Sequence, residues 1–140
     1  MPLVGGGGAP NVSGGANPSG TGSGLNYVGN HVYAMSGTVA ADDNNRTLLD
    51  FTTGGSSYIV AELQIGSDSG SGDDFRYSVL FNNLSIMEIY AQRTDQGFPN
   101  FGIPFRFIIP AETRVTIKAN NITTGTNRDT YATLVGRVYA

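Results

Sequence analysis

Large apolar residues alternate with polar ones along most of the chain after Leu25, a pattern typical of strands that bury one face. The alternation is clearest in Ser57–Ile65, where every second residue from Ile59 onward is aliphatic. Clusters of Gly, Pro, Asn and Asp separate these segments and indicate turns. We expect eight strands, which are His31–Val39, Arg46–Thr52, Ser57–Ile65, Phe75–Phe81, Leu84–Gln92, Pro104–Ile109, Thr113–Ala119 and Tyr131–Tyr139.

Two of the connections are short. Asn82–Asn83 predicts a tight turn between the fourth and fifth strands, and Pro110–Glu112 predicts a turn between the sixth and seventh. The fifth segment, Leu84–Gln92, is also made of good helix formers, so a helical turn is the alternative there. Its isoleucines and its place in a hairpin favour a strand.

Short strands with no helix between them predict a sandwich or a barrel. Eight strands are the number of a jelly roll, which consists of two four-stranded sheets. An immunoglobulin-like sandwich is the rival, and the lack of Cys and Trp argues mildly against it. We expect an all-β fold, a single eight-stranded jelly-roll sandwich with an extended Gly-rich N-terminal arm.

The first 24 residues differ from the rest of the chain. They contain nine glycines and three prolines, and the chain has no Asp, Glu, Lys or Arg before Asp42. Such a segment gains little from burial when it becomes ordered, so we expect it to need a partner. The sequence therefore predicts a Gly/Ser/Pro-rich arm at residues 1–24 and a jelly-roll domain at residues 25–140.

Charged residues make up only 14% of the chain, and the net charge is −3. The eight cationic residues are scattered, which is unlike a nucleic-acid-binding surface. No apolar run approaches the roughly 18 residues of a membrane-spanning helix, and the N-terminus has no signal-peptide pattern. We expect no nucleic-acid partner and no membrane insertion. A surface with few charges is poorly protected against association, which favours a protein that functions within an assembly.

Residues suited to catalysis are few. His31 is the single histidine, and no Gly-x-Ser-x-Gly motif presents a nucleophile. Glu62 and Glu88 lie on expected strands, where they could meet across a sheet as an acid pair, and Glu112 lies in a turn. Solvated strand positions explain the same residues equally well. We expect no enzyme activity, no catalytic residue and no cofactor.

Two further groups of residues suggest binding. The segment Ser67–Asp74 resembles a calcium loop in composition, although no Glu closes it as in an EF-hand, and a plain loop explains it as well. We therefore expect no metal site. Several strand cations would form an anion-binding surface if they shared one outward face; the alternative is local pairing with carboxylates. They are Arg76, Arg106, Arg114, Lys118 and Arg137.

The C-terminal third resembles a known family. The stretch from Ile103 to Val115, Ile-Pro-Phe-Arg-Phe-Ile-Ile-Pro-Ala-Glu-Thr-Arg-Val, and the closing Leu134–Ala140 are similar to the last strands of single-jelly-roll virion proteins. These include the penton proteins at the vertices of large icosahedral double-stranded DNA viruses and some phage decoration proteins. The resemblance implies a homo-oligomer, five-fold in the penton case, whose arm contacts neighbouring subunits, and it carries over no catalytic residue.

These observations lead to one expected function and one alternative. We expect a structural capsid subunit located in the virion, which forms the penton capsomer by self-association, with a trimer as the other possible state, and which contacts other capsid proteins. The alternative is a capsid decoration protein or a trimeric fibre-head module that binds a receptor or carbohydrate.

Overall fold

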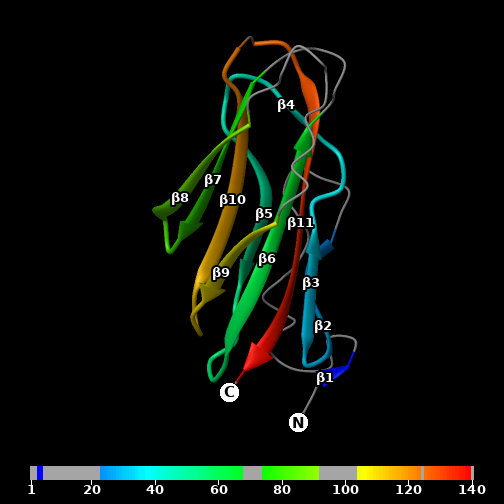
Figure 1. The fold of residues 1–140 in the computed structure, drawn as a ribbon, viewed down its shortest axis with the longest axis vertical. Helices are drawn as coiled ribbons and strands as arrows, with labels where there is room; N and C mark the ends of the chain where they lie inside the picture. Colours follow the sequence, from blue (N-terminus) through cyan, green and yellow to red (C-terminus); the bar gives the residue numbers. More distant parts are fainter. Residues whose placement is uncertain (1–2, 5–22, 68–73, 92–103, 124, 140) are drawn as a thin grey trace.

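The computed structural model describes residues 3–4, 23–67, 74–91, 104–123 and 125–139. These residues form strands and turns and no helix, so the expected all-β class is confirmed. The strands make two antiparallel sheets that pack face to face as a β-sandwich (Figure 1). Sheet A has the order β1-β2-β3-β11-β6-β9, with β4 also paired to β11, and sheet B has the order β5-β10-β7-β8.

The long strands β6 and β11 form the centre of sheet A and pair over ten positions, from Tyr58 opposite Tyr139 to Ser67 opposite Thr130. The strands of sheet A are β1 Leu3–Val4, β2 Ser23–Gly29, β3 His31–Met35, β4 Val39–Ala41, β6 Tyr58–Ser67, β9 Phe105–Ile109 and β11 Arg128–Tyr139. The strands of sheet B are β5 Arg46–Thr52, β7 Phe75–Phe81, β8 Leu84–Ala91 and β10 Arg114–Asn121.

The core lies between the two sheets and follows the predicted alternation. In β6, the residues from Ile59 to Ile65 that face sheet B are buried, while Tyr58 and Val60 are exposed on the other face. Sheet B contributes buried aromatic rings, among them Phe75 and Tyr77. The Tyr77 hydroxyl reaches across the core to the Gly66 carbonyl oxygen at 3.0 Å and to Thr130 Oγ1 at 2.7 Å, so it joins the two sheets.

Strand β5 buries two consecutive residues, Leu48 and Leu49, which strict alternation would place on opposite faces. The pairing with β10 shifts register at this point, since Ile117 lies opposite Leu49 while Lys118 lies opposite Thr47. This β-bulge leaves Leu48 without an opposite residue and turns both leucines into the core.

The predicted turns are confirmed. Asn82 and Asn83 have φ values of 49° and 68°, as a type I′ hairpin requires, and they join β7 to β8. The segment Leu84–Ala91 is a strand rather than a helical turn. The turn at Pro110–Glu112 joins β9 to β10 and ends on Glu112, whose φ is 51°. Asn adopts this left-handed conformation readily, whereas Glu adopts it less often.

The expected strand His31–Val39 is interrupted, which corrects the sequence-based prediction. Gly37 has a φ of 66°, a conformation outside the strand region, and it separates β3 from β4. Both strands still pair with β11, because the amide of Ser36 donates to the Ala132 carbonyl at 2.9 Å and Ser36 Oγ accepts from the Ala132 amide at 2.8 Å.

Strand β2 was not expected, although its sequence carries the strand signal. Leu25 and Tyr27 are buried and alternate with more exposed residues, and a two-residue turn at Gly29–Asn30 leads into β3. Burial raises the pKa of Tyr27, a shift that a hydrogen bond with the Gly54 backbone partly offsets. Its two glycines and one asparagine, which follow directly on the Gly-rich arm, weaken the strand signal.

Most of the expected arm, residues 1–24, lies outside the described residues, as does Gln92. The described exception near the N-terminus is β1, whose Leu3 and Val4 pair with Gly29 and Val28. Strand β1 and the end of β11 lie at the same end of the sandwich (Figure 1). Several strands also run further than expected, most of all β11, which begins at Arg128 instead of Tyr131.

Candidate functional site

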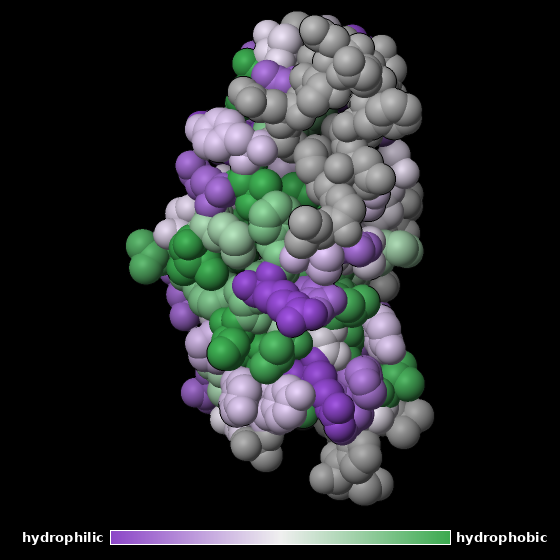
Figure 2. Space-filling model, in the orientation of Figure 1, coloured by the Kyte–Doolittle hydropathy of each residue, from purple (hydrophilic) through white to green (hydrophobic). Residues whose placement is uncertain are grey.

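The outer face of sheet A carries an unusual number of exposed apolar and aromatic residues. An antiparallel sheet with one solvated face normally alternates apolar residues inward with polar residues outward. Here the outward residues of β2, β3, β6, β9 and β11 include large apolar side chains, which are Val28, Tyr33, Met35, Tyr58, Val60, Ile108, Tyr131, Val135 and Tyr139. Figure 2 shows this face, where hydrophobic patches surround a strongly hydrophilic group over β9, β6 and β11.

A shallow hollow lies on this face and is the candidate site; we call it the outer hollow. Strands β3, β6, β9 and β11 build it, and its lining residues are His31, Tyr33, Val60, Glu62, Arg106, Val135, Gly136, Arg137 and Tyr139. The register places seven of these nine residues in two rows across the sheet, and Ile108, which is outside the lining, completes the second row. One row is Tyr33–Val135–Glu62–Arg106, and the next is His31–Arg137–Val60–Ile108.

The outer hollow contains one ion pair. Arg106 Nε lies 2.8 Å from Glu62 Oε1, and the two residues are directly opposite each other on β9 and β6. The Arg106 side chain is 76% exposed, so the pair contributes little to stability. Its effect on the surface is to neutralise both charges locally.

Arg137 differs from Arg106, because no described carboxylate pairs with it. Its guanidinium carbon lies 5.8 Å from the centre of the Tyr139 ring, a cation–π contact. The Tyr139 ring in turn stacks on Tyr58 with a centroid distance of 5.6 Å. His31 lies directly opposite Arg137 on β3. The outer hollow therefore combines aromatic walls with a cation that has no acidic partner among the described residues.

Gly136 belongs to the base of the outer hollow. A Cβ atom at this position would lie 2.7 Å from Ile59 Cγ2 and 2.9 Å from the Val60 carbonyl oxygen. Only glycine allows β11 to approach β6 and the core residues this closely. The hollow is thus built on a tightly packed part of the sheet.

The structure corrects the idea of an acid pair formed by Glu62 and Glu88. Glu62 lies on β6 in sheet A, whereas Glu88 lies on β8 at the edge of sheet B, so the two carboxylates cannot meet across one sheet. The partner of Glu62 is Arg106 instead. Glu112 lies on the turn between β9 and β10, where its side chain packs near Gly55.

The structure also corrects the idea that five strand cations share one outward face. Arg106 and Arg137 lie on sheet A, while Arg76, Arg114 and Lys118 lie on sheet B. The alternative of local pairing holds for two of them, Arg106 with Glu62 and Arg114 with Asp50. Alternation along each strand shows which residues face outward, but it cannot show in which sheet a strand lies.

The outer face of sheet B contains a bidentate ion pair and a guanidinium bonded to an amide, while no described ion pair includes its Lys118 or Glu88. Arg114 makes a bidentate contact with Asp50, with Nε to Oδ1 at 2.9 Å and a terminal nitrogen to Oδ2 at 2.7 Å. Arg76 Nε donates to Asn120 Oδ1 at 3.3 Å. Exposed apolar residues of this sheet concentrate on its edge strand β8, at Leu84, Ile86 and Tyr90.

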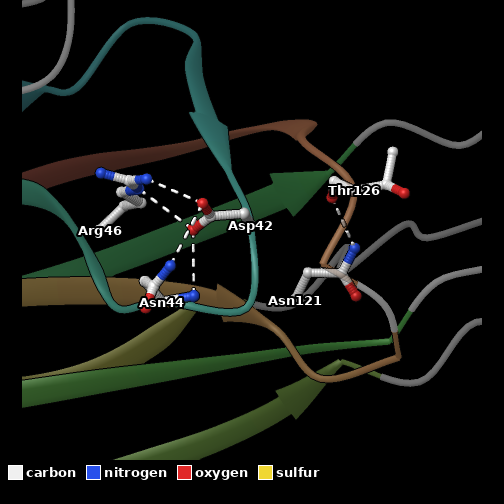
Figure 3. A network of polar contacts seen from close by, with 5 residues as sticks. All are labelled: Asp42, Asn44, Arg46, Asn121 and Thr126. Atoms are coloured by element: carbon white, nitrogen blue, oxygen red, sulfur yellow. Dashed lines mark hydrogen bonds and ion pairs between the residues drawn. The ribbon is translucent and has the colours of Figure 1, made fainter.

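A polar network closes one end of the sandwich (Figure 3). Asp42 accepts two hydrogen bonds from Arg46, at 3.2 and 2.8 Å, and one from the Asn44 amide at 3.0 Å. These contacts, led by the bond from Arg46, lower the pKa of Asp42 to about 2. The Asp42 carbonyl accepts from the Asn121 amide, and Asn121 Nδ2 donates to the Thr126 carbonyl. The network fixes the β4–β5 and β10–β11 connections to each other.

The expected loop at Ser67–Asp74 is mostly outside the described residues, because the structure describes only its two ends. The Asp74 amide donates to Thr123 Oγ1 at 2.8 Å, and the Asp74 carbonyl accepts from the Ile122 amide at 3.0 Å. Within the described ranges, no group of three or more His, Asp or Glu side chains is placed to hold a metal ion. No helix in the described part of the chain is long and apolar enough to cross a membrane.

The outer hollow itself was not predicted from the sequence. Its residues come from four strands, and sequence spacing does not reveal that β3, β11, β6 and β9 are neighbours. One signal was present, since Tyr58, Val60, Val135 and Tyr139 are large apolar or aromatic residues at positions that the alternation assigns to solvent. No protein-family model matches the sequence, and no curated protein matches it either.

Proposed function

We propose that the sandwich is a jelly roll and that the protein is a structural virion subunit that works by self-association. The strand order supports the jelly roll. The antiparallel pairs β3–β11, β5–β10, β6–β9 and β7–β8 are nested around the β7–β8 turn, and they alternate between the two sheets. This is the arrangement of a long hairpin rolled into two four-stranded sheets. Strands β1, β2 and β4 are additions to sheet A under this interpretation.

The observation that carries the assembly role is the apolar outer face of sheet A. Exposed apolar residues that cluster on one face mark a surface that another molecule covers. The low charge content of the chain, 14%, points the same way, because few charges oppose contact between copies. We propose a closed homo-oligomer, most simply the five-fold capsomer at a capsid vertex, that is built into a shell with other capsid proteins.

The N-terminal arm gives the test of incorporation into a shell. Removing residues 1–24 removes β1 and the first two residues of β2 but keeps the buried Leu25 and Tyr27 and strands β3 to β11, so we expect a folded domain by circular dichroism. We expect this variant to be missing from particles formed in cells that make the other shell proteins, whereas the full chain is incorporated. A variant in which the order of residues 5–22 is scrambled controls for arm length and composition.

Equal incorporation of the full chain and the truncated chain would contradict the role of the arm. A full chain that is folded but absent from purified particles would contradict the virion role itself. These two results are distinguishable, because the second concerns the unaltered protein.

A further inference from the structure

Two exposed surfaces of the described residues, each with large apolar side chains, differ in shape and in charge. The outer hollow on sheet A is concave and contains Arg137, which has no described acidic partner, with His31 beside it. The edge strand β8 of sheet B projects Ile86 and Tyr90, and Glu88 lies between them. We call these three residues the β8 strip.

Glu88 and Tyr90 project from the outer side of β8, opposite Ser78 and Arg76, and Ile86 is the extra residue of a β-bulge. Met87 and Ile89 alternate with them and face the core, opposite Val79 and Tyr77. Tyr90 is 58% exposed and Ile86 is 43% exposed. No described ion pair includes Glu88, so the strip presents one acidic side chain between two apolar ones.

The backbone of β8 adds a second reason for contact. In the described sheet, β8 pairs with β7 on one side and has no strand on the other. An edge strand with exposed apolar residues favours association, and charged residues usually protect such an edge. Here Glu88 is the single charged residue of β8, which leaves the edge weakly protected.

The two surfaces are complementary. The outer hollow offers Val60, Val135 and Tyr33 as an apolar lining and Arg137 as a cation. The β8 strip offers apolar side chains of matching character and a carboxylate between them. Pairing two β8 strips of identical copies about a two-fold axis would instead bring two Glu88 carboxylates towards each other. Charge therefore favours a contact between unlike surfaces.

We propose that the β8 strip of one copy of this chain packs into the outer hollow of the next copy, with Glu88 paired to Arg137. A contact between unlike surfaces repeats from copy to copy and closes into a ring when its rotation permits. The inference rests on the proposed self-association and names the surfaces that produce it. The hollow then buries its apolar lining, and Arg137 gains a carboxylate that no described residue of its own chain supplies.

Charge reversal tests the pairing in the full chain. Glu88→Arg and Arg137→Glu each place like charges in contact, so each should raise the protein concentration of half-dissociation by about tenfold or more. The double variant E88R/R137E restores opposite charges and should return this concentration close to that of the unaltered chain. Native mass spectrometry and light scattering measure the oligomer, and thermal unfolding confirms that each variant is folded.

Asp129→Arg provides a matched control for Glu88→Arg. Asp129 is an exposed acidic residue on β11, outside both the outer hollow and the β8 strip, and the change in charge is the same. We expect this variant to keep the oligomer. Equal dissociation of the control and Glu88→Arg would show an effect of net charge alone and would overturn the proposed pairing.

The remaining outcomes are also decisive. Single variants that remain as oligomeric as the unaltered chain overturn the proposed contact but leave self-association standing. A folded double variant that stays dissociated overturns the pairing of Glu88 with Arg137. An unaltered chain that is monomeric at every concentration contradicts both the contact and the proposed self-association.

Discussion

The two outer faces of the sandwich use their charged residues differently. On sheet B, Arg114 is held by Asp50 in a bidentate contact, and Arg76 bonds to Asn120. On sheet A, the ion pair of Arg106 with Glu62 leaves Arg137 against the ring of Tyr139. Apolar residues are exposed over the whole of sheet A but only along the edge strand of sheet B. Both faces also carry charged residues that no described ion pair includes, Arg137 on sheet A and Lys118 and Glu88 on sheet B, so the two sheets differ mainly in where they expose apolar residues.

The largest expected effect concerns the base of the outer hollow. Gly136→Ala places a Cβ 2.7 Å from Ile59 Cγ2 and 2.9 Å from the Val60 carbonyl oxygen, so the core must shift. We expect the free energy of unfolding to fall by about 1–3 kcal/mol, measured by urea denaturation.

Gly66→Ala is the matched control. Its Cβ would also come close to another residue, at 2.4 Å from the Tyr131 ring. That ring is largely exposed and can swing outward, so we expect a loss below about 1 kcal/mol. Equal losses in the two variants would contradict the view that the backbone approach at Gly136 is tight.

The next effect concerns association. Val135→Gln removes an apolar side chain from the middle of the outer hollow, while Thr52→Gln changes an outward position on β5 of sheet B. We expect the first variant to weaken self-association about fivefold, since roughly 1 kcal/mol of burial is lost, and the second to leave it unchanged. Dilution series followed by light scattering measure both. Equal weakening of self-association by the two variants would contradict the view that sheet A, and not this part of sheet B, is the association surface.

A smaller effect separates the two ion pairs. The Arg114–Asp50 pair is bidentate and its side chains are 52% and 23% exposed, whereas Arg106–Glu62 has a 76% exposed arginine. Double-mutant cycles with alanine should give coupling energies of about 0.2–1 kcal/mol for both pairs, with the larger value for Arg114–Asp50. A larger coupling energy for Arg106–Glu62 would show that bidentate geometry does not determine which ion pair is stronger.

The smallest effect is a pH dependence that belongs to neither face. The pKa of Asp42 is about 2 in the folded chain and 3.8 ordinarily, so its ionised form favours folding. The stabilisation is complete above pH 3.8 and disappears as pH falls towards about 2. Unfolding curves of the unaltered chain and Arg46→Leu should therefore differ near neutral pH and converge near pH 2. A constant difference across this range would exclude Asp42 as its origin.

The sequence predicted the class of fold well, because alternation along a strand directly encodes which residues meet the core. It failed where one residue changes the backbone, as at Gly37, and where a bulge buries the adjacent Leu48 and Leu49. The position of Glu88 illustrates another limit of the sequence, which does not show to which sheet a strand belongs. Its outward direction was predictable, but its distance from Glu62 depends on which sheet contains β8, and that is decided by long-range pairing.

The native mass of the full chain over a range of protein concentrations tests the central claim most directly. Self-association through unlike surfaces predicts a closed oligomer with a single mass, five copies for a vertex capsomer, which dissociates on dilution without an open-ended series of larger species. A trimer would still support the proposed association surface, but it would favour a decoration or fibre-head protein over a vertex capsomer. A folded monomer at all concentrations would contradict the account.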